Sequence, residues 1–268
     1  MTETSSGVLD TVVAGAGPAV VLIHGTGADA ESNWGPLIES LSGRYTVIAP
    51  NLPGAGGTPV SSDRLELDEL AAQVVAAVAA AGVVDRWHLV GHSLGAVVAA
   101  AVAASKPRQV RSLLLHAGWA TTGPREALMF DLWARLLSVE PQLLARHLVL
   151  EAMSPALLQS ADTCQLDDLV TGFTSMLDNR ITGQIELDSR IDLAASLAGI
   201  SATTLVLASA DDRIIPTAHQ RMLTEAIPGS LYREIAGGHG LPFENPAGFF
   251  ATVTEWVDQQ QAKTIAAA

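Results

Sequence analysis

The stretch Trp87-His-Leu-Val-Gly-His-Ser-Leu-Gly-Ala-Val-Val-Ala-Ala100 decides the fold of this chain. Its first four residues are typical of a short buried strand, and the alanine- and valine-rich residues at its end are typical of a helix. Between them lies Gly-x-Ser-x-Gly, in which two glycines let the strand and the helix approach closely around Ser93 in a strained turn. Such a turn exposes the serine hydroxyl, and the helix N-terminus behind it favours developing negative charge. We therefore expect a reactive serine at position 93.

Strands and helices alternate on both sides of this stretch. Continuous apolar runs predict strands, and segments with apolar residues at helical spacing follow them. This alternation is typical of a mostly parallel sheet with helices on both faces, which binds ligands at the carboxyl ends of its strands. Residues 8–13 and the glycine-rich turn after them predict an opening hairpin. The other expected strands are residues 19–23, 45–49, 110–116, 203–208 and 231–235.

Residues 120–199 interrupt the alternation. They contain no strand-like run, but three or four stretches with helical spacing. Because the insert leaves the sheet at the carboxyl end of a strand, we expect a cap, or lid, over the binding edge. A helical bundle on the back of the sheet is the alternative. The expected organisation is a first core segment (1–119), a helical cap (120–199) and a second core segment (200–268).

The composition limits the class of protein. The length of 268 residues fits one large α/β domain or one domain plus an insertion, and with 49% hydrophobic and 16% charged residues a sizeable core is available. The formal net charge of -13 argues against nucleic acid and anionic membranes as partners. Cys164 is the single cysteine, so no intrachain disulfide can form.

The sequence also allows expectations about cofactors, cellular location and assembly. No group of histidines and carboxylates has metal-ligand spacing, and we expect neither a metal nor a cofactor. Residues 1–7 do not resemble a secretory signal, and no apolar run is suited to crossing a membrane, so a cytoplasmic protein without membrane insertion is expected. We expect the protein to be a monomer or a homodimer. We also expect it to bind a small-molecule substrate.

A serine hydroxyl is a weak nucleophile unless a base accepts its proton and a carboxylate orients that base. Two candidate carboxylates, Asp211 and Asp212, follow an expected strand at its carboxyl end. His239 follows the last expected strand within a Gly-Gly-His-Gly loop. All of these residues are therefore expected at the same edge of the sheet as Ser93.

In these features the chain resembles the capped serine hydrolases of the α/β-hydrolase-fold superfamily, such as esterases, lactonases and C–C hydrolases. The resemblance extends from about residue 8 to residue 261 and includes the chain order Ser, Asp, His. It implies a mostly parallel twisted sheet of about eight strands, with helices on both faces and a helical cap. The matching motifs are His24-Gly-Thr-Gly27, Asn51-Leu-Pro-Gly-Ala-Gly-Gly-Thr58, Gly91-His-Ser-Leu-Gly95, Asp212-Arg-Ile-Ile-Pro216, Gly238-His239 and Glu244-Asn-Pro246.

The resemblance also implies individual roles. Ser93 matches the nucleophile and His239 the general base. Asp212 matches the acid, because this family's acid precedes a proline by four residues; Asp211 is the alternative. The backbone N–H groups of Thr26 and Leu94 match the oxyanion hole. A serine in this turn argues against the dehalogenases and epoxide hydrolases of the same fold, which carry aspartate there.

Substrate contacts are expected near the cap and at a strand end. The candidates are Trp119, His116, Met129 and Trp133. The favoured function is hydrolysis of a small to medium apolar ester or lactone through an acyl-enzyme. A non-hydrolytic lyase or cyclase on the same scaffold is the first alternative, and a non-catalytic ligand receptor is the second.

Overall fold

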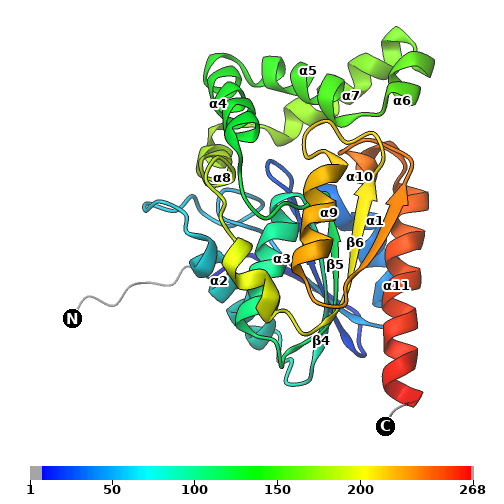
Figure 1. Cartoon of the computed structure of the whole chain (residues 1–268). Helices are drawn as coiled ribbons and strands as arrows, with labels where there is room; N and C mark the ends of the chain where they lie inside the picture. Colours follow the sequence, from blue (N-terminus) through cyan, green and yellow to red (C-terminus); the bar gives the residue numbers. More distant parts are fainter. Residues whose placement is uncertain (1–7, 267–268) are drawn as a thin grey trace.

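The computed structural model describes residues 8–266, and a seven-stranded sheet runs through its centre (Figure 1). The strand order is β1-β3-β2-β4-β5-β6-β7. Only β1 is antiparallel to its neighbour. Residues 1–7, on which the expectation about a secretory signal rests, lie outside the described part of the chain. The strands are β1 Thr11–Ala14, β2 Ala19–Ile23, β3 Thr46–Pro50, β4 Trp87–His92, β5 Val110–His116, β6 Thr203–Ser209 and β7 Leu231–Ile235.

The predicted opening hairpin is wrong. β1 pairs antiparallel with β3, not with β2, which is next to it in the chain. The turn after β1 does reverse the chain, but β2 enters the sheet one position further in and pairs with β3 and β4. Six of the seven strands are close to the predicted ranges.

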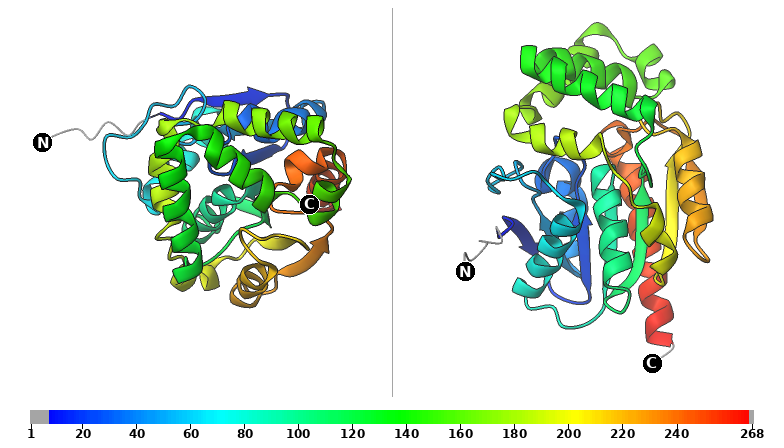
Figure 2. Two further views of the ribbon diagram at one scale, coloured as in Figure 1. Left: turned by 90° about the horizontal axis from the view of Figure 1, so that it is seen from above. Right: turned by 60° about the vertical axis from the view of Figure 1, so that its left-hand side comes forward.

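Helices cover both faces of the sheet because the central strands are apolar on both sides. In β2, Val20 and Leu22 pack against one helical layer, and Val21 and Ile23 pack against the other. Figure 2 shows the two layers. The first layer contains α1 (Ala30–Ser42) and α11 (Pro246–Ala266), and the second contains α2 (Leu67–Ala80), α3 (Leu94–Ser105) and α9 (Thr217–Ala226).

The helix that follows Ser93 is the most buried one. Residues 94–103 of α3 are all buried, and most of them are alanine or valine. Small side chains on every face let this helix pack closely against the sheet and its helical neighbours. The close packing holds the beginning of α3, and therefore the turn at Ser93, in a fixed place at the carboxyl edge of β4.

The helical insert lies over the carboxyl ends of the strands, between β5 and β6 in the chain (Figure 1). Its small 3-10 turns are η1 (Asn179–Ile181) and η2 (Ala194–Gly199), and α10 (Leu241–Glu244) follows β7 nearby. No helix among residues 8–266 is both long and apolar enough to cross a membrane. The helices of the insert are α4 Pro124–Val139, α5 Pro141–Ala152, α6 Pro155–Ser160, α7 Thr163–Met176 and α8 Thr182–Asp188.

Candidate active site

Ser93 occupies a strained turn between β4 and α3. Its φ angle is 55°, a left-handed conformation that residues other than glycine rarely adopt. Both flanking glycines are sterically required. A Cβ atom on Gly91 would lie 2.2 Å from the carbonyl oxygen of Gly95, and one on Gly95 would lie 2.1 Å from that of Ile23. The backbone therefore holds the serine hydroxyl out from the carboxyl end of the sheet.

A chain of hydrogen bonds joins Ser93 to a histidine and a carboxylate. Nε2 of His239 lies 2.9 Å from Oγ of Ser93, and Nδ1 lies 2.9 Å from Oδ2 of Asp212. Oδ1 of Asp212 accepts hydrogen bonds from the backbone N–H groups of Ile214 and Ile215, at 3.0 and 2.8 Å. These bonds fix the carboxylate in the orientation that holds the imidazole with Nε2 toward the serine.

Of the two candidate carboxylates, only one lies at the site. Asp212 is buried and bonds His239. Asp211 is exposed, and its backbone N–H donates to the carbonyl oxygen of Gly237. The geometry thus separates two neighbouring aspartates that chain order alone left open.

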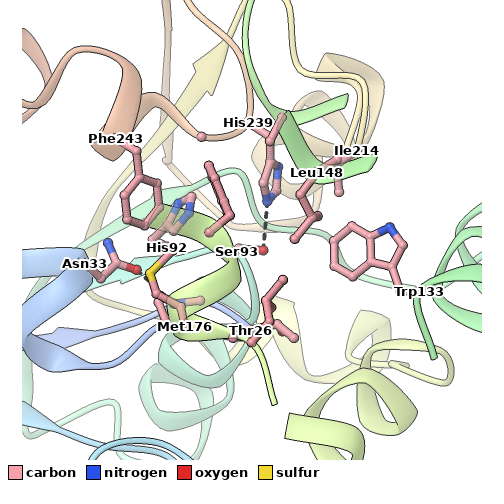
Figure 3. A pocket seen from close by; sticks show the side chains of 17 residues that line it. Thr26, Asn33, His92, Ser93, Trp133, Leu148, Met176, Ile214, His239 and Phe243 are labelled. Carbon is pink, nitrogen blue, oxygen red and sulfur yellow. Dashed lines mark hydrogen bonds between the residues drawn. The ribbon is translucent and has the colours of Figure 1, made fainter. Parts of the chain in front are cut away.

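Two candidate backbone donors, the N–H groups of Leu94 and Thr26, each belong to a residue that follows a strand near Ser93. Leu94 is the first residue of α3, and Thr26 lies in the turn that follows β2. Within residues 8–266, no hydrogen bond uses either N–H group. In Figure 3, Thr26 lies on the opposite side of Ser93 from His239. The arrangement can hold a carbonyl oxygen between two donors while the hydroxyl attacks the carbonyl carbon.

Helix α8 fixes the turn that carries Thr26. The Thr26 hydroxyl donates to Oδ2 of Asp188 at 2.6 Å, and the Gly27 N–H donates to Oε1 of Gln184 at 3.1 Å. The Gln184 amide also donates to the carbonyl oxygen of Pro53 at 2.9 Å. Gln184 and Asp188 are both almost fully buried and lie one helical turn apart. No sequence signal pointed to these two residues.

Burial changes the charge state of Asp188. Its removal from water raises the pKa of the carboxyl group to about 8, against the smaller opposing effect of the Thr26 hydrogen bond. Oδ1 has no hydrogen-bond partner among the described residues. At neutral pH the carboxyl group is therefore mostly protonated.

The three histidines beneath the site are neutral. The His24 Nδ1–H donates to the Gly25 carbonyl oxygen, and Nε2 accepts from the Leu52 N–H, both at 2.9 Å. Burial lowers the pKa of His24 to about 4. His92 and His116 face each other through their Nδ1 atoms at 2.9 Å, and burial lowers the pKa of both well below the usual value. None of these rings is placed as His239 is, with a nitrogen on the serine hydroxyl.

A cavity of about 50 Å³ lies between Ser93 and the insert. Of the four predicted substrate contacts, Trp133 lines it and the other three do not. The Trp119 ring stacks on Phe130 and its indole N–H donates to Thr122. His116 is fully buried, with Nε2 against Ser209, and Met129 packs on the apolar core. The lining residues that were not predicted as contacts include Asn33, Leu148, Met176, Ile214 and Phe243.

Comparisons with known proteins identify the family. A family model described as the alpha/beta hydrolase fold matches residues 18–246. The chain is 37% identical over 237 residues to pyrrolizixenacetamide deacetylase of Xenorhabdus hominickii, covering 88% of this chain and 89% of that protein.

Solved structures share the fold. A hydrolase from Pseudomonas aeruginosa PA01 has a TM-score of 0.80 and 25% identity, with 95% of this chain and 96% of that chain covered. The enol-lactonase from Burkholderia xenovorans LB400 has a TM-score of 0.80 and 21% identity, with 93% and 96% covered. The predicted fold class is confirmed, and the chain is an enzyme of the α/β-hydrolase family.

Proposed function

We propose that this enzyme is a serine hydrolase that cleaves small to medium apolar carboxylic esters or lactones through an acyl-enzyme. The observation that carries the proposal is the hydrogen-bonded chain from Ser93 through His239 to Asp212. Each member has the neighbour that its role requires. The hydroxyl has a base, and the base has a buried carboxylate.

In the first half of the reaction, Oγ of Ser93 bonds to the carbonyl carbon while its proton passes to Nε2 of His239. The carbonyl π electrons move to oxygen, where the N–H groups of Thr26 and Leu94 bind the negative charge. When the carbonyl re-forms, the bond to the leaving oxygen breaks, and that oxygen takes the proton from His239. In the second half, water attacks the acyl-enzyme in the same way and releases the carboxylic acid and Ser93.

The helical insert has a part in this proposal. Side chains from α4, α5 and α7 close the cavity over Ser93. We propose that residues 120–199 act as a cap, as the sequence suggests, and that they exclude bulk water from the acyl-enzyme. In a site with little water, the two N–H donors stabilise negative charge more strongly than they would in solution.

A second candidate reaction is hydrolysis of a small amide by the same residues. The relative from Xenorhabdus is named as a deacetylase of an acetamide, and it covers most of this chain. The same steps would apply, with His239 delivering its proton to a leaving nitrogen.

The test is turnover of chromogenic esters, lactones and anilides of graded size by the wild type and by Ser93→Ala. We expect the variant to keep its fold, judged by circular dichroism, and to lose turnover by several orders of magnitude. A fluorophosphonate probe should label the wild type at Ser93 and leave the variant unlabelled. Turnover unchanged in Ser93→Ala would refute the assignment. Product formed in ¹⁸O-labelled water without incorporation of the label would favour the lyase or cyclase alternative.

A further inference from the structure

Two cavities of very different size meet at the site. The inner cavity, of about 50 Å³, contains Ser93 and His239. An outer groove of about 690 Å³ begins on the other side of a shared wall formed by Phe173, Met176 and Phe243. The inner cavity is thus far smaller than the groove. A larger substrate must therefore extend into the groove.

The two ends of the inner cavity differ chemically. Figure 3 shows Trp133, Leu148 and Ile214 on one side of Ser93, and Asn33, Met176 and Phe243 on the other. At the first end the six-membered ring of Trp133 is turned toward Ser93, and the indole nitrogen, which is buried and has no hydrogen-bond partner among the described residues, lies farther from the serine (Figure 3). The second end includes Met176 and Phe243, which also line the groove.

Asn33 supplies a free donor at the second end of the inner cavity. Its Oδ1 accepts a hydrogen bond from the Gly25 N–H at 3.0 Å, which fixes the orientation of the amide. Its Nδ2 is buried and has no hydrogen-bond partner among the described residues. A buried donor without a partner is costly, and a ligand atom that accepts from it recovers that cost.

We propose that the substrate lies across Ser93, with a short apolar acyl group at the Trp133 end and a larger leaving group in the outer groove. The hydrocarbon chain of the acyl group fits beside the Trp133 ring, and it has no atom that could accept a hydrogen bond from Asn33. The oxygen with which the leaving group of an ester begins can accept from Nδ2. This inference rests on the function proposed above and names its substrate class: short-chain acyl compounds, open rather than cyclic, of bulky alcohols or amines.

The groove also limits the charge of the leaving group. Among the described residues that line the groove, Asp168 is the only one with an ionisable side chain. The other polar positions are uncharged hydroxyls and an amide: Ser32, Ser160, Gln165 and Ser175. A neutral or cationic leaving group is therefore accepted, and an anionic one is not matched by any positive side chain.

The experiment uses two substrate series. The first keeps 4-nitrophenol as leaving group and lengthens the acyl group from acetate through butyrate and hexanoate to octanoate. The second keeps acetate and enlarges a neutral phenol of matched acidity. For the wild type we expect kcat/KM to fall at least roughly tenfold for each step beyond butyrate, as pockets discriminate methylene groups. In the second series kcat/KM should hold or rise with size.

Variants separate the two ends. Leu148→Ala should move the acyl optimum to longer chains and leave the second series unchanged. Met176→Ala and Phe243→Ala should change the second series and leave the acyl optimum in place. Leu150→Ala, two residues after Leu148 on the same helix but 59% exposed, is the matched control and should change neither series.

The inference is overturned if octanoate is cleaved as fast as acetate, if no ester of either series is cleaved, or if Met176→Ala moves the acyl optimum while Leu148→Ala moves the leaving-group preference. Ser93→Ala distinguishes this failure from failure of the proposed function. If Ser93→Ala abolishes turnover but the profiles do not separate, only the placement of the substrate is wrong.

Discussion

The Thr26 hydroxyl donates a 2.6 Å hydrogen bond to Oδ2 of Asp188, across 162 positions of sequence. This contact joins the turn after β2 to the last residue of α8. One helical turn earlier, Gln184 bonds the neighbouring Gly27 N–H. The position of a proposed oxyanion donor is therefore coupled to the helical insert.

Replacing Thr26 with valine removes this bond at nearly constant volume. We expect Thr26→Val to lower kcat roughly tenfold to a hundredfold with little change in KM, because a displaced N–H binds the transition state less well than before. The loss stays below that for removal of a whole oxyanion donor. Thr26→Ser keeps the hydroxyl and should recover most of the activity. Equal kcat values for the valine and serine variants would contradict a positioning role.

The raised pKa of Asp188 makes stability depend on pH. A carboxyl whose pKa is higher in the folded than in the unfolded chain binds its proton more tightly when folded. Its contribution therefore favours folding at low pH and is lost as pH rises from about 4, the usual value, to about 8. Asp188→Asn removes this titration and should flatten the decline in the free energy of unfolding.

Urea denaturation at about pH 5, 7 and 9 measures the difference. The advantage of Asp188→Asn over the wild type should grow with pH. Asp167→Asn, at an exposed position of α7, serves as control and should follow the wild type. Parallel curves for wild type and Asp188→Asn would show that the carboxyl group titrates alike in both states.

The two adjacent aspartates provide a matched pair. Asp212→Asn removes the charge that orients His239 and should lower kcat by roughly 10⁴-fold, as expected for the acid of such a triad. Asp211→Asn changes an exposed carboxylate one residue away and should leave kcat within about twofold of the wild type. Steady-state hydrolysis of a chromogenic acetate measures both. Similar losses in the two variants would show that the assignment of the acid is mistaken.

The turn around Ser93 tolerates no side chain at Gly95. Gly95→Ala places a Cβ within 2.1 Å of the Ile23 carbonyl oxygen, so strand and helix must separate. The free energy of unfolding should fall by several kcal/mol, and activity should fall with it. In Gly172→Ala the added Cβ meets nothing within 4 Å, and the variant should gain about 0.5–1 kcal/mol. Thermal unfolding of the purified variants gives both values.

Much of the fold could be predicted because the central strands are built around apolar runs, which is clearest in β2. The pattern around Ser93 also predicted the strand, the turn and the buried helix that the structure contains. The partner of β1 could not be predicted. β1 is short and half-buried, and its pairing with β3 depends on where β3 enters the sheet.

The candidate site was predictable only in part, because chain order shows which residues follow strands but not how the helices of the insert are oriented. Ser93, Asp212 and His239 each follow a strand, so chain order places them at one edge. The lining of the cavity depends on how the helices of the insert turn their faces. His116 ends a strand near the site, yet its register opposite His92 puts its ring beneath the serine turn. Gln184 and Asp188 could not be predicted as site residues, because their role depends on hydrogen bonds to residues that are far away in the sequence.

The helices of the insert differ in how firmly they are held to the rest of the molecule. Gln184 and Asp188 anchor α8 to the core, and the Asp188 carbonyl oxygen accepts from Thr122. In contrast, α6 has no buried side chain and α7 has only two. Because few buried contacts mean a low cost of local opening, we expect α6 and α7 to be the part of the insert that opens when substrate and product exchange. The enzyme can thus admit its ligands without releasing the turn that must stay in register for the chemistry.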